Sequence, residues 1–373
     1  MSDTGVIKPG DVIGVLGDGQ LGKMLGQAAS KLGLKLFSLG DHGRISPTGQ
    51  AAWRAEAWEK DSVVPEKLLT EFCKTVKVAL VEFENVPVGL VRAIEARGVS
   101  VRSGAHVLAT AQDRIFEKDL ATELRIKTPG YRSIRCVADV VGSKASATQD
   151  SILKTTRNGY DGKGQVRIKS GESIANAWVQ LDKQPCILED RVEFAYEISV
   201  IVARSSREIL CMGPFENAHE NGILRTSTYP VRSSSADFID LRSRACAAAQ
   251  KLAVELGVHG LLAVEFFVTT EGELIFNEMA PRPHNSGHLT IECCETSQFE
   301  QYIRASCDWT LGSAHMHSFG EMRNIIGDEV FAWPDALDAS RTSLHLYGKS
   351  EAKPGRKMGH VVRSWHDPDR SCH

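Results

Sequence analysis

The strongest constraint on the fold lies near the N-terminus, where an apolar run meets a cluster of glycines. Residues 12–16 read VIGVL, and the segment GDGQLG follows at residues 17–22. An apolar run without polar alternation is typical of a strand that is buried on both faces of a parallel sheet. Residues 21–32 and 34–39 then have the patterns of a helix and a second apolar strand. The chain therefore opens as a βαβ unit, and we predict a parallel-sheet domain at its start.

The glycine segment has more than one interpretation. Gly17, Gly19 and Gly22 fit the G-x-G-x-x-G pattern, in which the backbone approaches a phosphate and the helix N-terminus supplies free N–H groups. Asp41 follows at roughly the distance, about 20 residues, at which an NAD site keeps its ribose-binding acid. However, Asp41 lies in a glycine-flanked turn, and no second mononucleotide-binding half is recognisable downstream. A phosphate site is favoured, while a dinucleotide site and a purely structural turn stay open.

Composition excludes several classes of protein. The 373 residues are 42% apolar and 24% charged, which is too apolar for a disordered chain, and no run approaches the roughly 20 apolar residues of a membrane span. A net charge of -3 without a long basic block gives no electrostatic footprint for nucleic acid. The N-terminus lacks a signal-peptide pattern, and the scattered cysteines favour reduced thiols over disulfides or zinc. We predict a cytoplasmic protein without nucleic-acid or membrane partners.

A third apolar strand-like run, residues 76–83, ends in acidic side chains. Glu82 and Glu84 stand at its carboxyl end. Open parallel sheets bind ligands at that edge. The two carboxylates are therefore candidates for a ligand site beside the glycine segment.

A glycine-rich loop joins two predicted strands in the middle of the chain, residues 151–155 and 166–169. Gly159, Gly162 and Gly164 surround Lys163 in this loop. Such glycines let backbone N–H groups converge on phosphate oxygens, and the lysine adds a positive charge. We favour a flap that closes over phosphates and excludes water, and a solvated hairpin tip is the alternative.

Two acidic residues stand in a predicted hairpin of apolar strands. With Thr270 and Glu271 at the tip, Glu265 lies opposite Phe276 and diagonal to Glu278, so both carboxylates project from one face. Two acids among phenylalanines repel each other unless a cation lies between them, and Mg²⁺ takes such oxygen ligands together with nucleotide phosphates. The alternative is a pair of solvent-facing strand acids.

Nitrogen donors follow directly after this hairpin. Arg282, His284, Asn285 and His288 stand within seven residues, an arrangement suited to a small oxyanion beside the metal. The alternative for the histidines is a satisfied position in the core. A second basic cluster, at residues 349–357, either folds back over the site as a phosphate hold or forms a solvated surface loop.

Together these motifs resemble the ATP-grasp superfamily and, within it, the 5-(carboxyamino)imidazole ribonucleotide synthase family of purine biosynthesis. The resemblance is carried by GQLG (19–22), EFEN (82–85), GYDGKGQ (159–165), HENGILRTS (219–227), NEMAPRPHNSGH (277–288) and PGRKMGH (354–360). It spans essentially the whole chain. It implies an α/β and α+β architecture, an ATP-grasp fold with three parts: a Rossmann-like domain at 1–111, an ATP-grasp domain at 112–320 with a flap subdomain at about 128–196, and a small β-rich domain at 321–373.

The same resemblance implies the residues that hold ATP and its metal. The implied ATP contacts are Arg114, Lys154, Gly159, Tyr160, Asp161, Gly162, Lys163, Gly164, Gln165, Glu189, Asp190, Arg191, Val192, Glu197, His219, Asn277 and Glu278. In this set Val192 contacts the adenine edge and Glu197 the ribose hydroxyls. Glu265 and Glu278 match the ligands of Mg²⁺, which Mn²⁺ can replace.

The resemblance also implies a substrate pocket and catalytic residues. The implied pocket residues are Gly19, Gln20, Leu21, Gly22, Glu82, Tyr160, Arg282, His284, Lys349, Arg356 and Lys357. The implied catalytic residues are Asp161, Lys163, Arg282 and His284. Which cation takes bicarbonate and which takes the ribonucleotide phosphate stays open. The first glycine segment is thereby reassigned from a dinucleotide to a substrate phosphate.

The implied reaction is the ATP-dependent carboxylation of aminoimidazole ribonucleotide by bicarbonate through carboxyphosphate, in a homodimer. Asp161 or a phosphate oxygen takes the proton that leaves the amine. Competing hypotheses are an NAD-dependent dehydrogenase, a nucleotide-sensing module without turnover, and a ligase that uses formate or an amino acid. Two departures from the family pattern concern loop geometry only: Asn158 replaces a usual glycine, and the turn at residues 40–47 is atypical.

Overall fold

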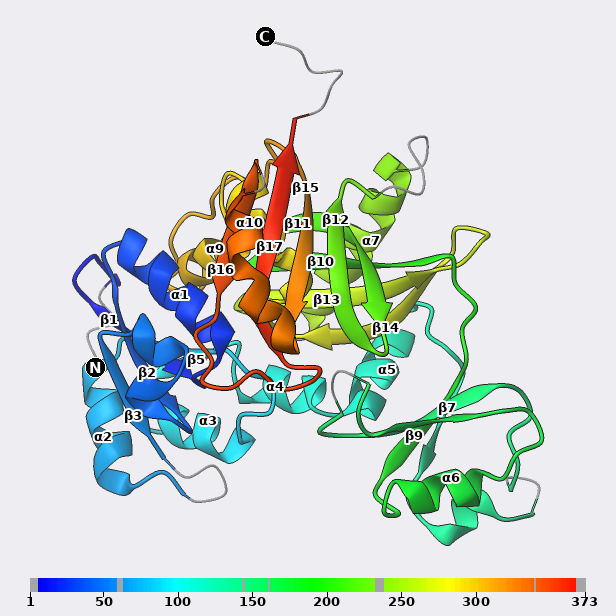
Figure 1. The fold of residues 1–373 in the computed structure, drawn as a ribbon. Helices are drawn as coiled ribbons and strands as arrows, with labels where there is room; N and C mark the ends of the chain where they lie inside the picture. Colours follow the sequence, from blue (N-terminus) through cyan, green and yellow to red (C-terminus); the bar gives the residue numbers. More distant parts are fainter. Residues whose placement is uncertain are drawn as a thin grey trace.

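The computed structural model describes residues 6–58, 63–142, 145–159, 162–231, 238–338 and 340–366. Two predicted site residues, Tyr160 and Asp161, lie outside the described residues. The described part forms three sheets of five, eight and four strands (Figure 1). No helix in these ranges is both long and apolar enough to cross a membrane.

The first sheet is parallel, as the opening apolar runs predict. Its order is β3-β2-β1-β4-β5, with strands Arg54–Ala57, Lys35–Gly40, Val12–Leu16, Val78–Val81 and Ser100–Arg102. The associated helices are α1 (Gln20–Lys31), α2 (Glu66–Thr75), α3 (Val88–Glu95) and α4 (Ala105–Ala111), with short 3-10 turns at Gly43–Ile45 and Thr48–Gln50. The buried apolar strands β1 and β4 end at one edge, where the glycine segment meets Glu82.

The four-stranded sheet lies at the lower right of Figure 1, away from the first sheet. Its order is β6-β9-β7-β8, with strands Tyr131–Ile134, Cys186–Asp190, Ser151–Thr155 and Gln165–Ile168, all antiparallel. Helix α6 (Ile174–Gln180) packs on it, and a 3-10 turn covers Val137–Val140. The sheet has its own small core, which contains Leu153 and Trp178. The glycine-rich loop joins β7 to β8, as predicted.

The central sheet has eight antiparallel strands in the order β14-β13-β10-β11-β12-β15-β17-β16. Their bounds are Leu274–Ala280, Gly260–Val268, Tyr196–Arg204, Ile209–Glu220, Ile223–Tyr229, Phe319–Ile326, Lys357–Trp365 and Thr342–Leu346. Alternate residues of β10 enter two cores: Val200 and Val202 pack with α7 (Phe238–Glu255), and Ile201 and Ala203 pack with α9 (Gln298–Ser306). Because both faces are covered, most residues of β10 and β13 are apolar. Helix α5 (Arg114–Glu123) packs beside β14.

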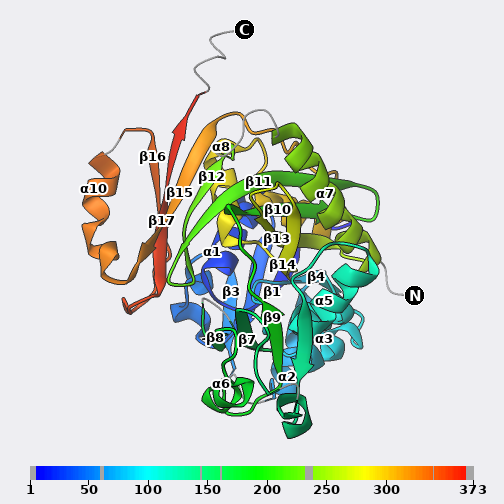
Figure 2. The same cartoon turned by 90° about the vertical axis from the view of Figure 1, so that its right-hand side faces the viewer.

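The last fifty residues, where the resemblance implies a small β-rich domain, contain two long strands. Strands β15 and β17 have eight and nine residues, and they continue the central sheet through the pairing of β12 with β15. A 3-10 turn, Gly327–Ala332, and helix α10 (Trp333–Asp338) lie outside β16 and β17 (Figure 2). A short helix, α8 (Thr290–Cys293), follows the 3-10 turn Asn285–Leu289. The β-rich character is as expected, but these strands extend the central sheet.

One buried tyrosine joins the first sheet to the central unit. The hydroxyl of Tyr302, on α9, accepts a hydrogen bond from Val81 N–H at 3.1 Å and donates to the Arg102 carbonyl at 2.8 Å. Its side chain is fully buried. Strands β4 and β5 are thereby held against α9, which fixes the edge of the first sheet relative to the central sheet.

We expect Tyr302→Phe to lower the free energy of unfolding by about 1–3 kcal/mol, because Val81 N–H loses its acceptor in the interior. Urea unfolding of the whole chain measures this loss. An unfolding midpoint equal to that of the unsubstituted chain would contradict the assigned role of the hydroxyl.

Candidate active site

The acidic hairpin forms, but with a register different from the expected one. Glu265 pairs directly with Glu278, whereas Phe276 pairs with Phe266. The ladder shifts between Glu265 and Phe266, so Asn277 is an extra residue on β14. The predicted diagonal arrangement is therefore wrong, because a β-bulge places two residues opposite one. Direct cross-strand partners share a face of the sheet, so the Cβ atoms of Glu265 and Glu278 lie closer together than those of a diagonal pair.

Each carboxylate of the pair has a nitrogen partner. Glu278 accepts from Arg114 Nη1 at 2.8 Å, and Glu265 Oε1 lies 2.9 Å from His284 Nε2. Glu265 is buried, which excludes the alternative of a solvent-facing acid at that position. Burial alone would raise the pKa of Glu278, but the Arg114 guanidinium outweighs it and lowers the pKa to about 2. The hairpin therefore presents a charged carboxylate at neutral pH.

The surroundings of the pair fit a hard divalent cation. Asn277 Oδ1 is buried and has no hydrogen-bond partner among the described residues. Ligand atoms of Glu197, His219 and Glu265 lie within 4.8 Å of one another. Burial lowers the pKa of His219, but its contact with Glu197, at 3.0 Å, raises the pKa more. Mg²⁺ takes oxygen ligands, so the oxygens of Glu265, Glu278 and Asn277 suit that ion, whereas the His219 nitrogen does not.

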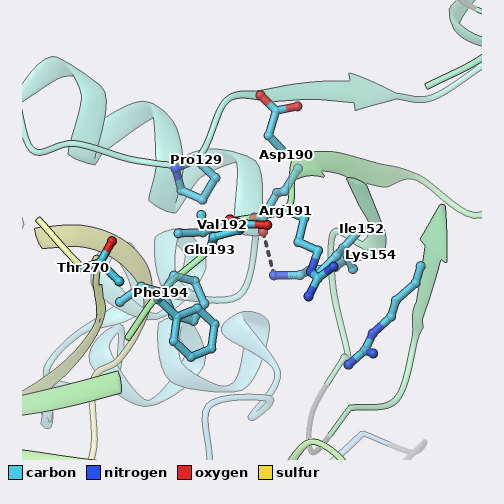
Figure 3. Close-up of a pocket in the computed structure, with 12 residues that line it drawn as sticks. Pro129, Ile152, Lys154, Asp190, Arg191, Val192, Glu193, Phe194 and Thr270 are labelled. Carbon is cyan, nitrogen blue, oxygen red and sulfur yellow. Dashed lines mark hydrogen bonds and ion pairs between the residues drawn. The ribbon is translucent and has the colours of Figure 1, made fainter. Parts of the chain in front are cut away.

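A pocket of about 520 Å³ opens between the four-stranded sheet and the acidic hairpin (Figure 3). Its lining residues are Pro129, Ile152, Lys154, Arg167, Glu189, Asp190, Arg191, Val192, Glu193, Phe194, Phe267 and Thr270. The lining includes the hinge segment 189–192 and Lys154, which the sequence singled out. Sequence reasoning missed Phe194 and Phe267, whose rings stack with centroids 4.6 Å apart. A pocket of this size, lined by both apolar and charged side chains, suits a nucleobase and its sugar.

Two charged residues of α5, Glu117 and Lys118, lie in this site although the sequence did not predict them there. The Glu189 carboxylate forms ion pairs with Lys154 Nζ at 2.6 Å and with Lys118 Nζ at 3.4 Å. Lys118 is 1% exposed and also donates to the Asn277 carbonyl. Glu117 accepts Met279 N–H at 3.1 Å, and its burial raises its pKa to about 8. Glu117 and Lys118 lie on the buried face of α5. The partners of a polar residue on that face cannot be predicted from the helical pattern, because they come from distant parts of the sequence.

The buried Glu189 makes stability depend on pH in the acid range. Burial alone would raise the pKa of Glu189, but Lys118 and Lys154 lower it from 4.5 to about 2. A carboxyl with a lowered pKa in the folded state stabilises the fold above its unfolded pKa, and this contribution is lost as pH falls.

We therefore expect the unsubstituted chain to lose up to about 3 kcal/mol relative to Glu189→Gln between pH 4.5 and 2. Urea unfolding at a series of pH values measures the difference between the two proteins. A difference that stays constant across this range would show that the two lysines do not hold Glu189 charged.

The backbone N–H groups of the glycine segment have a different partner from the expected phosphate. Gly19 N–H donates to Glu82 Oε1 at 2.9 Å and Gly22 N–H to Glu82 Oε2 at 3.0 Å. A Cβ on Gly17 would approach Glu82 Oε1 to 2.5 Å. The expectation of free N–H groups for a phosphate is therefore wrong at Gly19 and Gly22, because a protein carboxylate already fills the N-terminus of α1. Burial raises the pKa of Glu82.

The donors after the hairpin have defined partners. Arg282 Nε forms an ion pair with Glu84 Oε2, and Arg282 Nη1 donates to the Pro283 carbonyl at 2.9 Å. Burial opposes ionisation of Glu84, but Arg282 lowers its pKa below the usual value. Asn285 pairs with Asn324, and His288 is fully buried beside Gln298. Of the four donors, Arg282 and His284 are thus held towards the acidic residues, whereas Asn285 and His288 belong to the interior.

The segment that leads into the second basic cluster contacts α1. Lys23, on α1, donates to the carbonyls of Leu346 and Tyr347 at 3.0 and 3.3 Å. Lys349 Nζ donates to the Lys357 carbonyl at 2.7 Å, and Arg356 Nη1 donates to the Glu351 carbonyl at 3.0 Å. The residues that lead into this cluster therefore contact α1 (Figure 1), and the choice between a phosphate hold and a surface loop stays a prediction.

The flap loop shows why one departure from the family pattern is tolerated. Asn158 has a φ of 62°, and Gly162 and Gly164 have φ of 76° and 70°. Asparagine is the commonest non-glycine choice for such a left-handed backbone, so it can stand where a glycine is usual. Arg114 Nη2 donates to the Gly159 carbonyl at 3.3 Å, which ties the start of the flap to the partner of Glu278.

Comparison with known families divides the chain into three matches. A ribonucleotide synthetase preATP-grasp domain matches residues 11–112, and an ATP-grasp domain matches residues 119–299. A phosphoribosylaminoimidazole carboxylase C-terminal domain matches residues 321–370.

Individual relatives match over nearly the full length. N5-carboxyaminoimidazole ribonucleotide synthase of Brucella melitensis biotype 1 is 40% identical over 96% of this chain and 97% of its own. The Bacillus subtilis (strain 168) synthase is 39% identical over 96% and 92%. The ADP complex of an N5-carboxyaminoimidazole ribonucleotide synthetase superposes with a TM-score of 0.90 at 38% identity, over 98% and 95% of the two chains. An Aspergillus clavatus synthase in complex with ADP and 5-aminoimidazole ribonucleotide gives 0.84 at 28% identity, over 96% and 94%.

Proposed function

The chain belongs to the N5-carboxyaminoimidazole ribonucleotide synthase family of ATP-grasp ligases, and we propose that Glu265 and Glu278 form the metal site at which it activates bicarbonate. It catalyses the ATP-dependent carboxylation of aminoimidazole ribonucleotide in purine biosynthesis. The single observation that carries the residue assignment is the direct cross-strand pairing of these two glutamates beside the nucleotide-sized pocket.

Bicarbonate is a poor electrophile at neutral pH, so a useful rate needs activation. Transfer of the terminal phosphoryl group of ATP to bicarbonate would give carboxyphosphate, whose carbon the exocyclic amine of the ribonucleotide then attacks. The carbamate forms and phosphate leaves, and the amine loses a proton to Asp161 or to a phosphate oxygen. A divalent cation, when bound, would neutralise the charge on the transferring phosphoryl group.

The chain's own residues would bind and orient ATP. The hinge segment 189–192 would face the adenine, and the stacked Phe194 and Phe267 would cover an apolar side of the pocket. Lys154 lines this pocket beside Glu189, with its Nζ 2.6 Å from the carboxylate, so it can reach a phosphate while staying charge-balanced. Glu265, Glu278 and Asn277 Oδ1 would hold Mg²⁺, or Mn²⁺ in its place. The glycine-rich flap would close over the phosphates and exclude water, which competes for the labile intermediate.

The remaining cations would hold the two other substrates. Arg282 and His284 lie next to the acidic pair and would take bicarbonate. Lys349, Arg356 and Lys357, on the loop that returns to α1, would take the ribonucleotide phosphate. The segment 19–22 with Glu82 would then shape the imidazole end of the pocket, with Glu82 offering an oxygen where a phosphate was first expected.

An omission assay tests the function directly. We expect ADP release at full rate only with ATP, Mg²⁺, bicarbonate and aminoimidazole ribonucleotide together. Formate or an amino acid in place of bicarbonate should not support the reaction, which separates this activity from that of a related ribonucleotide ligase. ADP release that does not respond to either bicarbonate or the ribonucleotide would contradict the proposal. The homodimer, the cytoplasmic location and the domain boundaries stay predictions.

A further inference from the structure

A chain of buried hydrogen bonds leads from the interior of the central sheet to His284. Ser227 Oγ donates to Asn217 Oδ1 at 2.8 Å, and Asn217 Nδ2 donates to Ser199 Oγ at 3.0 Å. Ser199 Oγ donates to Ser286 Oγ at 2.6 Å, and Ser286 Oγ lies 2.7 Å from His284 Nδ1. The members come from β12, β11, β10 and the 3-10 turn after the hairpin, so four separate segments build one line of polar contacts.

These side chains lie where the sheet needs no polar group. Ser199, Ser227 and Ser286 are fully buried, and Asn217 is 5% exposed. Buried polar groups cost free energy unless each one is hydrogen-bonded, and apolar side chains of similar size avoid that cost. Apolar side chains could therefore stabilise this part of the sheet equally well. The hydrogen-bonded side chains instead point to a role in the site, through their contact with His284.

The hydroxyl groups of this chain of hydrogen bonds donate towards His284. The backbone N–H of Ser286 points at His284 Nδ1 at 3.4 Å, and a backbone N–H can only donate. At the other end the amide of Asn217 donates to Ser199, so the hydroxyl hydrogen of Ser199 is directed to Ser286 and that of Ser286 to His284. Because Nδ1 accepts, the hydrogen of the neutral imidazole is on Nε2.

Nε2 faces the acidic pair, at 2.9 Å from Glu265 Oε1. We propose that Ser199, Asn217 and Ser286 are positioning residues that hold His284 in the tautomer with its hydrogen on Nε2. In this tautomer the ring donates to Glu265 and to an anion bound beside it. In the other tautomer a nitrogen lone pair would face the carboxylate and repel it. The identity of that anion as bicarbonate rests on the proposed function, whereas the tautomer does not.

Kinetics of Ser286→Ala test the role of the chain of contacts. We expect kcat/KM for bicarbonate to fall about 10-fold, the usual effect of losing a partner that orients a site histidine, with KM for ATP unchanged. Ser199→Ala should have a smaller effect, because Ser286 can still donate to His284. The double variant should match Ser286→Ala alone, since Ser199 acts only through Ser286.

Ser306→Ala is the matched control, because its hydroxyl is also fully buried and has no hydrogen-bond partner in the described part of the chain. It should leave all kinetic constants unchanged. If Ser286→Ala and Ser199→Ala change the kinetic constants for all three substrates by the same factor, the serines are merely structural and the proposal is overturned.

Nitrogen-15 spectra of the histidine rings read the tautomer without any activity. In the unsubstituted protein His284 should show a protonated Nε2 and an unprotonated Nδ1, with its signals assigned by their loss in His284→Gln. Ser286→Ala should give a mixture of tautomers, and Ser306→Ala should not. A protonated Nδ1 in the unsubstituted protein overturns the proposal whatever the substrate is. An enzyme that shows the expected tautomer but does not use bicarbonate would instead contradict the proposed function alone.

Discussion

Glu278→Gln should reduce ADP formation at least about 10³-fold, a loss of about 4 kcal/mol of transition-state stabilisation. Glu278 is the more exposed member of the cross-strand pair, with its side chain 39% exposed, and it is also the partner of Arg114. A neutral amide can neither balance a divalent cation nor pair with the guanidinium. A coupled assay of ADP release, with all four reactants at saturation, measures the loss.

Glu271→Gln is the control for this variant, because Glu271 is an exposed acid at the tip of the same hairpin. It should keep full activity. Glu278→Gln also leaves Arg114 without its partner, so its unfolding should be compared with that of the unsubstituted chain. A folded Glu278→Gln protein that releases ADP rapidly would refute the metal assignment.

Arg282→Met should lower kcat about 10²–10³-fold, the usual effect of removing one preorganised donor to a developing negative charge. The ion pair with Glu84 holds the guanidinium in place beside the hairpin. The same substitution leaves the Glu84 carboxylate without its cation in a largely buried place, which should cost about 3–5 kcal/mol of stability. Steady-state kinetics with varied bicarbonate and urea unfolding measure the two effects separately.

The double variant Glu84→Gln with Arg282→Met distinguishes catalysis from folding. It removes both charges, so we expect most of the lost stability to return. Activity should not return, because the donor to bicarbonate is still missing. Recovery of both stability and activity would show that Arg282 acts only as the partner of Glu84.

The sequence predicted the elements that depend on local pattern. The apolar run 12–16 predicted a parallel strand, and the TTEG turn predicted a hairpin with Glu265 and Glu278 on one face. Both signals are local, because they depend on residues that are neighbours along the chain. The bulge at Asn277 is different, because the pairing of two whole strands decides where an extra residue fits.

Features that depend on distant partners could not be predicted in this way. Lys118 has the pattern of a helix residue, and only the folded chain brings Glu189 and the Asn277 carbonyl to it. The glycine segment and Glu82 were both placed at the same sheet edge by sequence. Whether a phosphate or the Glu82 carboxylate accepts the N–H groups at the start of α1 depends on the length and direction of the Glu82 side chain.

The flap is a case in which sequence and structure explain each other. The sequence marked Asn158 as a departure from the family pattern, and its φ of 62° supplies the reason that the departure is tolerated.

The basic cluster at residues 349–357 had two alternatives that composition could not separate. Leu346 and Tyr347, which lead into it, are held to α1 by Lys23, more than three hundred residues away along the chain.

The central claim is that one divalent ion is held between two side chains of a single β-hairpin. Crystals of the chain grown with a non-hydrolysable ATP analogue and Mn²⁺ test this claim most directly, since anomalous scattering locates the ion. We predict a peak at about 2.0–2.2 Å from carboxylate oxygens of both Glu265 and Glu278, in contact with the nucleotide phosphates. An ordered nucleotide with no ion between these two side chains would contradict the account.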